Sequence, residues 1–183
     1  MLSFSKKKWC LAEVSTDKSL ALAKELDIPV TIAVLMINRG VTTTEDAKHF
    51  LHADLALLHD PFLMAGMGEA VKRVIRAIDD EESITVFCDY DVDGVTSAAF
   101  LTHFFRDLDC AVTAYLPERH IEGYGLNSDA VRKIREQGTT LMITADCGIT
   151  GVKEVALANE LGLDVIVTDH HQVGEEGLPK AVA

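Results

Sequence analysis

The sequence lacks the features that mark secreted, membrane-spanning or zinc-binding proteins. Its four cysteines are widely spaced and form no CxxC pair, so neither a disulfide framework nor a zinc site is indicated. No apolar run approaches the roughly 20 residues that a membrane helix needs, and residues 1–8 hold no apolar signal-peptide core. These absences favour a cytoplasmic protein that does not contact a membrane.

Basic residues are also scarce, because 17 Lys and Arg stand against 29 Asp and Glu, for a formal net charge of −12. A basic nucleic-acid-binding surface is therefore not expected as the main feature of this chain. The acidity is uneven, since residues 67–183 hold 21 of the acidic side chains and only 10 of the basic ones. With 48% hydrophobic residues in 183, the composition is otherwise that of a globular protein of one domain plus a remainder.

The first third of the chain has the pattern of a small helical domain. Helices are expected over 17–26 after a cap at Thr16 or Asp17, from Pro29 to Gly40, and from the capping-box spacing Thr42–Glu45 to about Leu51. The stretch 52–68 contains Asp60-Pro61 and two glycines and is predicted to be a connection. We therefore expect one domain over 1–66 and a second over 67–183.

After residue 69 the pattern becomes one of helices alternating with short strands. Val71, Val74 and Ile78 share one helix face, and a series of β-branched runs and helical stretches follows. The strands are expected over 84–88, 111–116, 141–144 and 164–168, and the helices over 96–108, 128–136 and 150–161. This alternation predicts an α/β fold, in which a parallel sheet has helices on both faces.

Acidic motifs directly follow three of the four expected strands. These are Asp89–Gly94 after the first, Asp146–Gly148 after the third and Asp169–His171 after the fourth, whereas the second strand leads into Leu116–Arg119. Functional groups in such sheets gather at the carboxyl ends of the strands, beside the point where strand order reverses. If the three motifs converge, the first, third and fourth strands are neighbours and the order is 2-1-3-4.

The motif Asp89–Gly94 is open to three interpretations. An EF-hand loop needs a preceding helix and a Glu at its twelfth position, where this chain has Phe100, so that interpretation is excluded. A haloacid-dehalogenase-type phosphatase is matched by Asp91–Gly94, but its downstream Lys and acidic pair do not stand clearly in place, so it stays open. The third interpretation is a cluster of carboxylates that binds metal ions.

The metal-binding interpretation accounts for most of the pattern. A single Asp after a strand is usually a turn residue or a helix cap, and paired histidines are commonly surface residues. Three aspartates within five residues, however, repel one another unless a cation neutralises them. Carboxylates with one imidazole suit Mn²⁺ or Mg²⁺, and such a set can bridge two ions roughly 3.5–4 Å apart, an arrangement used in phosphoryl transfer and hydrolysis.

Together the three motifs resemble motifs one to three of the DHH phosphoesterase superfamily. The flanking segments 38–42, 58–63, 116–119 and 122–126 are similar to one branch of it, the exonucleases that digest single-stranded DNA from the 5′ end. The resemblance implies a two-metal phosphodiesterase that releases mononucleotides in DNA repair and recombination. It also implies single-stranded DNA as substrate and a single-stranded-DNA-binding protein as a further partner.

The resemblance also assigns roles to individual residues. It places metal ligands on four side chains: Asp91, Asp93, Asp146 and His170. Asp89 is either a further ligand or a partner of one. The catalytic pair would be His171, beside the scissile phosphate, and Asp169, which orients the imidazoles. Arg119 is either a contact to a substrate phosphate or a surface ion pair.

Two departures from the family pattern bear on activity. Phe87 stands where many members have a His, and the family's further Asp motif and nucleic-acid-gripping domain are absent from the 183 residues. We therefore expect an N-terminal fragment with weak or no activity, whose strand-gripping basic surface lies elsewhere. The alternatives are an enzyme for short oligonucleotides, cyclic dinucleotides or pyrophosphate, a non-catalytic DHH-like scaffold, and a flavodoxin-like nucleotide-binding module.

Overall fold

The computed structural model describes residues 8, 10, 12, 13, 15–52 and 54–183. The chain forms two compact units, Met1–Asp60 and Pro61–Ala183. This division falls within the predicted connection 52–68, a few residues before the boundary expected after residue 66. No helix in the described part of the chain is long and apolar enough to cross a membrane.

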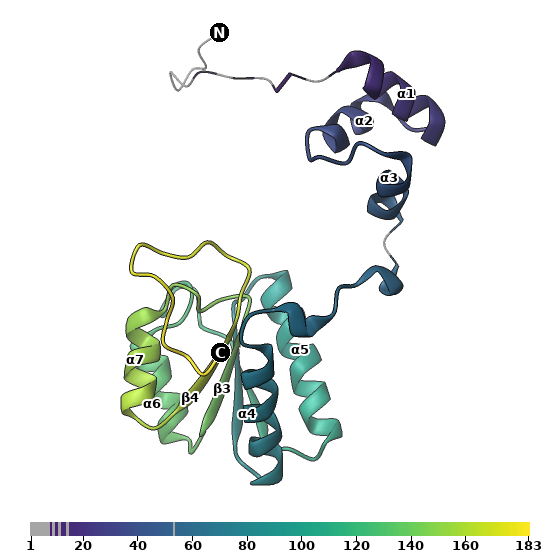
Figure 1. The fold of residues 1–183 in the computed structure, drawn as a ribbon. Coiled ribbons are helices and arrows are strands. Elements are labelled where there is room, and N and C mark those ends of the chain that lie inside the picture. Colours follow the sequence, from purple (N-terminus) through teal and green to yellow (C-terminus); the bar gives the residue numbers. More distant parts are fainter. Residues whose placement is uncertain (1–7, 9, 11, 14, 53) are drawn as a thin grey trace. The chain divides into compact units, whose positions relative to one another are not determined.

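The described residues of the first unit form three short helices (Figure 1): α1 (Thr16–Leu26), α2 (Val30–Ile37) and α3 (Thr44–Leu51). Their shared core consists of Leu22, Ala23, Ala33, Met36 and Ala47. A 3₁₀ turn, η1 (Leu55–Leu57), follows α3.

The caps of these helices differ from those predicted. Ser15, not Thr16 or Asp17, is the N-cap of α1, because its extended backbone lets its hydroxyl accept the amide of Lys18. At α3 the reciprocal pair is Thr43 with Asp46, one residue later than the predicted box, and the Thr43 hydroxyl donates to the Asp46 carboxylate at 2.7 Å.

The second unit is an α/β domain built on a parallel sheet. After the 3₁₀ turn η2 (Pro61–Leu63) come α4 (Met67–Asp79), β1 (Ile84–Cys88), α5 (Val92–Asp107), β2 (Val112–Tyr115), α6 (Ser128–Glu136), β3 (Leu141–Ala145), α7 (Val152–Glu160) and β4 (Asp164–Thr168). All pairings are parallel and the strand order is β2-β1-β3-β4. The predicted fold class and strand order are therefore confirmed.

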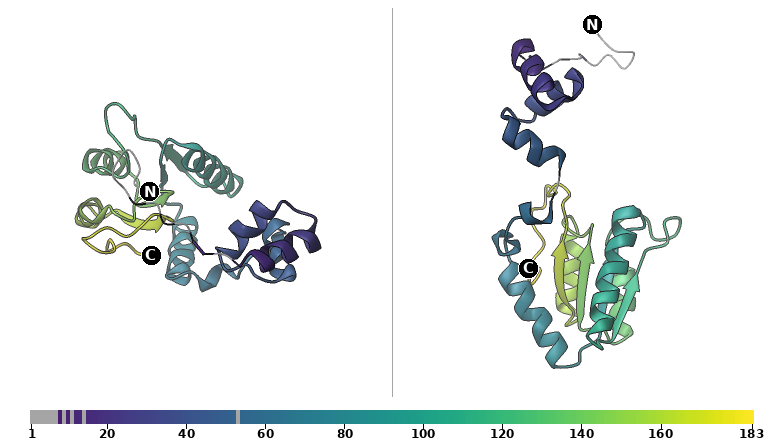
Figure 2. Two further views of the ribbon diagram at one scale, coloured as in Figure 1. Left: turned by 90° about the horizontal axis from the view of Figure 1, so that it is seen from above. Right: turned by 90° about the vertical axis from the view of Figure 1, so that its right-hand side faces the viewer.

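Helices cover both faces of the sheet, as the view from above shows (Figure 2, left). α4 and α5 pack on one face through Ala77, Ala98 and Phe105, and α6 and α7 pack on the other through Val131, Ile134 and Val155. Every residue of β1 and β3 is buried, which is expected of strands covered on both sides.

Helix α5 begins at Val92, four residues before the predicted start, and this places Asp93 in its first turn. The reason is the cap, since the Asp91 carboxylate accepts the amides of Asp93 at 3.0 Å and Gly94 at 3.1 Å. Gly94 allows the tight turn from β1, because a Cβ at this position would lie 2.1 Å from the carbonyl oxygen of Asp89.

An ion-pair network lies at the amino ends of the strands, that is, at the amino edge of the sheet. Arg73 of α4 is 6% exposed and contacts the carboxylates of Glu82 at 2.7 Å and Asp164 at 2.5 Å. Glu82 also accepts the hydroxyl of Thr140, which precedes β3. The hydrogen bond from Arg73 lowers the pKa of Glu82 in spite of its partial burial. The network thus joins α4 to the starts of β1, β3 and β4.

Candidate metal centre

The register of the sheet brings three acidic residues to one level of its carboxyl edge. Cys88 pairs with Ala145, and Ala145 pairs with Thr168. The residue after each of these three is an aspartate, namely Asp89, Asp146 and Asp169. The order β1-β3-β4 therefore converts motifs that are far apart in the sequence into one row.

Asp146 is the centre of this row. Its carboxylate lies 2.9 Å from Nε2 of His170, and ligand atoms of Asp146, His170 and His171 lie within 4.8 Å of one another. The Asp146 backbone is left-handed, with φ of 63°, and its amide donates to the Thr168 carbonyl at 3.0 Å. Burial raises the pKa of Asp146, and the neighbouring Asp91 raises it further.

Asp91 faces Asp146 from the start of α5, with the two carboxylates within hydrogen-bonding reach. The amide of Gly94, and then that of Asp93, lower the pKa of Asp91, which therefore stays ionised beside Asp146. Two facing carboxylates and an imidazole form the donor set that Mn²⁺ or Mg²⁺ accepts. A divalent cation here would remove the repulsion between Asp91 and Asp146, so the residues present fit a metal ion.

Asp93 lines a cavity beside this centre, whereas Asp89 is buried at the end of β1. A cavity of about 340 Å³ beside the centre is lined by Asp93, Thr96, Ser97, Ala145, Asp146, Thr168, Asp169 and His170. Asp89 is 1% exposed, and its carboxylate accepts the amide of Tyr90 at 2.7 Å. Asp89 is thus held in place at the end of β1, and whether it is a ligand or a partner of one stays a prediction.

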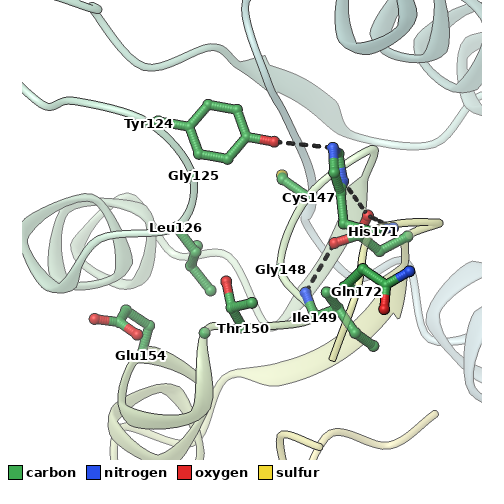
Figure 3. Close-up of a pocket in the computed structure, with 12 residues that line it drawn as sticks. Tyr124, Gly125, Leu126, Cys147, Gly148, Ile149, Thr150, Glu154, His171 and Gln172 are labelled. Atoms are coloured by element: carbon green, nitrogen blue, oxygen red, sulfur yellow. Dashed lines mark hydrogen bonds and ion pairs between the residues drawn. The ribbon is translucent and has the colours of Figure 1, made fainter. Parts of the chain in front are cut away.

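Asp169 orients His171, which is labelled in Figure 3. One carboxylate oxygen accepts both the amide of His171 at 3.0 Å and its ring Nδ1 at 2.7 Å, and the other accepts the amide of Ile149 at 2.9 Å. Burial opposes ionisation of Asp169, but these bonds outweigh it and lower its pKa. The hydrogen bond from Asp169 raises the pKa of His171. His171 therefore has a defined tautomer, with hydrogen on Nδ1.

Tyr124 is a site residue to which the sequence assigned no role. Its hydroxyl lies 3.3 Å from Nε2 of His171, and both residues line a cavity of about 380 Å³ with Leu126, Gly148, Thr150 and Glu154 among its walls (Figure 3). Burial, followed by the carboxylates of Asp89 and Asp146, raises the pKa of Tyr124. The one feature of the sequence that could have pointed to Tyr124 is its position in the Gly-containing loop after β2.

Arg119 lies apart from the carboxylate row. Its guanidinium carbon is 5.3 Å from the centre of the Tyr90 ring, and the side chain is exposed. Among the described residues Arg119 is in no ion pair, and its role as a phosphate contact or as a surface ion pair stays a prediction. Tyr90 in turn meets the ring of Tyr124 edge to face at 6.3 Å.

Two cysteines and one phenylalanine near the centre belong to the core. Cys88 and Cys147 are buried, and burial raises the pKa of both thiols, that of Cys88 to about 11, so they are protonated at neutral pH. Phe87 is fully buried and stacks on Tyr115 at 5.4 Å. The position at which related enzymes often have a His therefore supplies no ligand in this chain.

The second unit matches a known protein family. Residues 83–183 match the model of the DHH family, N-terminal domain. The chain is 45% identical over 172 residues to the single-stranded-DNA-specific exonuclease RecJ of Bacillus subtilis (strain 168), covering 94% of this chain and 22% of that protein.

Solved structures of RecJ are similar as well. One of exonuclease RecJ bound to manganese has 36% identity and a TM-score of 0.62 and covers 70% of this chain and 32% of that one. One of RecJ in complex with Mn²⁺ from Thermus thermophilus has 28% identity and a TM-score of 0.65 and covers 94% and 24%. The chain spans 22% to 32% of the length of these relatives. Given the matched domain and the three convergent motifs, this chain belongs to the DHH family.

Proposed function

We propose that this chain carries the metal-dependent centre of an exonuclease that hydrolyses single-stranded DNA from the 5′ end and releases mononucleotides. The observation that supports the proposal is the convergence of Asp91, Asp146 and His170 at the carboxyl edge of the sheet. The similarity to exonucleases of this specificity supports the choice of substrate. The cellular role that follows is DNA repair and recombination in the cytoplasm, together with a single-stranded-DNA-binding protein.

Each site residue has a part in this proposal. Asp91, Asp93, Asp146 and His170 would hold Mn²⁺ or Mg²⁺, with Asp89 supporting them from below. Bound ions supply a water of lowered pKa and neutralise charge on phosphate oxygens.

The remaining residues act on the substrate. Asp169 orients His171 so that Nε2 is presented to the scissile phosphate as a hydrogen-bonding and proton-handling group. The exposed guanidinium of Arg119 contacts a phosphate of the DNA strand.

The acidic charge of the chain is compatible with this function. Five of the acidic residues lie in the three motifs, where bound cations offset their charge. Affinity for a DNA strand depends mainly on neutralisation of phosphates by Lys and Arg. We therefore propose that this chain by itself binds DNA weakly, and that further basic surface in the intact protein grips the strand.

The proposal is tested by hydrolysis assays in Mn²⁺ with this chain and with a longer protein that contains it. Single-stranded DNA labelled at the 5′ or the 3′ end, duplex DNA, and dinucleotides are compared as substrates. We expect mononucleotides released from the 5′ end of single strands, slowly by this chain. Faster turnover of dinucleotides than of long single strands would favour an enzyme of short oligonucleotides, and no metal binding would favour a non-catalytic scaffold.

A further inference from the structure

The loop between β2 and α6 brings Tyr124 to the metal centre and places Arg119 over Tyr90, to one side of the centre. Tyr124 reaches Nε2 of His171, and Arg119 lies over the ring of Tyr90. Both residues are exposed, and the segment 118–121 around Arg119 is exposed throughout. Some other part of the loop must therefore fix where these two side chains point.

Glu122 makes the contacts that fix the loop. One of its carboxylate oxygens accepts the hydroxyl of Tyr115, the last residue of β2, at 2.5 Å. The other accepts the amide of Glu118 at 2.7 Å. The carbonyl of Glu118 in turn accepts the amides of Ile121 and Glu122 at 2.9 and 2.8 Å. A single carboxylate thus ties the middle of the loop to its own beginning and to the end of the strand.

Tyr115 is a firm point of attachment. Its ring stacks on that of Phe87 with an angle of 13° between the planes, and Phe87 is fully buried. The ammonium of Lys133 on α6 lies 5.2 Å from the centre of the Tyr115 ring. The hydroxyl of Tyr115 and the amide of Glu118 lower the pKa of Glu122, so the carboxylate is charged at neutral pH.

The backbone beside Glu122 needs such an anchor. Gly123 and Gly125, on either side of Tyr124, have φ angles of 81° and 78°. Glycine populates positive and negative φ about equally, so the sequence alone does not hold Tyr124 in place. The bonds of Glu122 immediately precede this flexible pair and restrict it from one side.

We propose that Glu122 is a positioning residue, which anchors the loop 116–127 on Tyr115 and so aims Tyr124 at His171 and holds Arg119 where the DNA phosphate lies. This inference rests on the proposed function for the roles of His171 and Arg119. The anchor itself depends only on contacts within the chain. It can therefore be tested in two ways, of which one is independent of catalysis.

The first test is limited proteolysis by trypsin, with the products identified by mass spectrometry. Cleavage after Arg119 reports opening of the loop, and cleavage after Arg39 in the first unit is the internal reference. We expect Glu122→Ala to raise the ratio of the two rates about ten-fold and Tyr115→Phe to raise it by a smaller factor. Glu118→Gln is the matched control, because among the described residues the Glu118 side chain makes no hydrogen bond or ion pair, and its ratio should equal that of wild type. A wild-type ratio in both Glu122→Ala and Tyr115→Phe would overturn the anchor.

The second test is a double-mutant cycle in Mn²⁺-dependent hydrolysis of single-stranded DNA. We expect Glu122→Ala and Arg119→Ala each to raise KM about ten-fold with kcat changed less than three-fold and Mn²⁺ affinity unchanged. The double variant should be no more than about three-fold worse than either single one, because Glu122 acts through the loop that carries Arg119. Glu122→Gln, which keeps one accepting oxygen, should lie between wild type and Glu122→Ala.

The outcomes of the second test separate the two proposals. Multiplicative losses in the double variant, or an equal fall of kcat and of Mn²⁺ affinity, would overturn positioning by Glu122. Absence of hydrolysis by a longer wild-type protein that contains this chain would instead overturn the proposed function, and the proteolysis ratios would still decide whether Glu122 anchors the loop.

Discussion

Asp146 and Asp169 follow two residues that pair in the sheet, Ala145 and Thr168, yet their pKa values shift in opposite directions. The pKa of Asp146 is raised because this carboxyl group is buried and faces Asp91. The pKa of Asp169 is lowered because the amides of Ile149 and His171 and the His171 ring donate hydrogen bonds to its carboxylate. Asp146 thus faces a second carboxylate as well as His170, whereas Asp169 is surrounded by donors. The difference supports the proposed roles of Asp146 as a metal ligand and of Asp169 as an orienting residue.

Replacement of Asp146 should abolish the metal site. We expect Asp146→Ala to weaken Mn²⁺ binding by at least about 100-fold, because it removes the carboxylate that lies next to both Asp91 and His170. Isothermal titration calorimetry with Mn²⁺ measures this directly. Asp107→Asn, at the exposed far end of α5, is the matched control and should bind as wild type does. Equal binding by Asp146→Ala and wild type would contradict the assignment of the site.

Asp169→Asn should lower the pKa of His171 in the metal-free protein. The hydrogen bond to the Asp169 carboxylate raises this pKa, and a neutral amide stabilises the imidazolium less. NMR titration of the ring protons measures the shift, with Asp107→Asn as control.

The raised pKa of His171 also makes the stability of the protein depend on pH. A raised folded pKa stabilises the protein below the unfolded value of about 6.5, and the contribution is lost as pH rises through the folded pKa. The stability of wild type relative to Asp169→Asn should therefore fall over that interval. An unchanged pKa of His171 in Asp169→Asn would show that another group raises it.

Gly94→Ala should destabilise the second unit by at least about 2 kcal/mol, because its Cβ would lie 2.1 Å from the Asp89 carbonyl oxygen. Gly68 lies in the first turn of α4, and a Cβ added there would have no atom within 4 Å. Gly68→Ala should therefore leave the stability unchanged or raise it by up to about 1 kcal/mol. Urea unfolding followed by circular dichroism compares the two. Similar midpoints for both variants would mean that the turn after β1 relaxes without cost.

Glu82→Gln should cost about 2–3 kcal/mol of stability at pH 7, because it leaves the buried Arg73 with weaker compensation. Glu176→Gln, which breaks the exposed pair with Lys153, should cost less than about 0.5 kcal/mol.

The lowered pKa of Glu82 also predicts the effect of acid. Its contribution is present above the unfolded pKa of about 4.3 and is lost as pH falls through the folded value. Unfolding in urea between pH 6 and pH 3 should therefore show a steeper loss in wild type than in Glu82→Gln. Parallel curves would contradict the coupling of Glu82 to Arg73.

The topology and most of the site could be predicted because both follow from the order of short motifs along the chain. Strands 84–88, 141–145 and 164–168 are each followed by an Asp, and a parallel sheet places such ends at one edge. Of the side chains that the sequence singled out, Asp91, His170 and His171 lie near Asp146, Asp93 lines the adjacent cavity, and Arg119 lies to one side on Tyr90.

What the sequence could not provide depends on side-chain geometry. The position of a cap depends on which of several neighbouring hydroxyls or carboxylates reaches a free amide, so Ser15, Thr43 and Asp91 had to be seen in the structure. The contact between Tyr124 and His171 joins residues 47 positions apart through a loop with no regular period. The burial of Asp89 likewise depends on packing at the end of β1 and does not follow from its spacing in the motif.

The ion-pair network of Arg73, Glu82 and Asp164 and the carboxylate row lie at opposite edges of the same sheet. The repulsion between the carboxylates is therefore about 17 Å, one strand length, from the ion pairs that join α4 to the sheet. Substitutions at the two edges should be energetically independent. An engineer could therefore reinforce the amino edge first, and then remodel the ligands at the carboxyl edge without losing a folded protein.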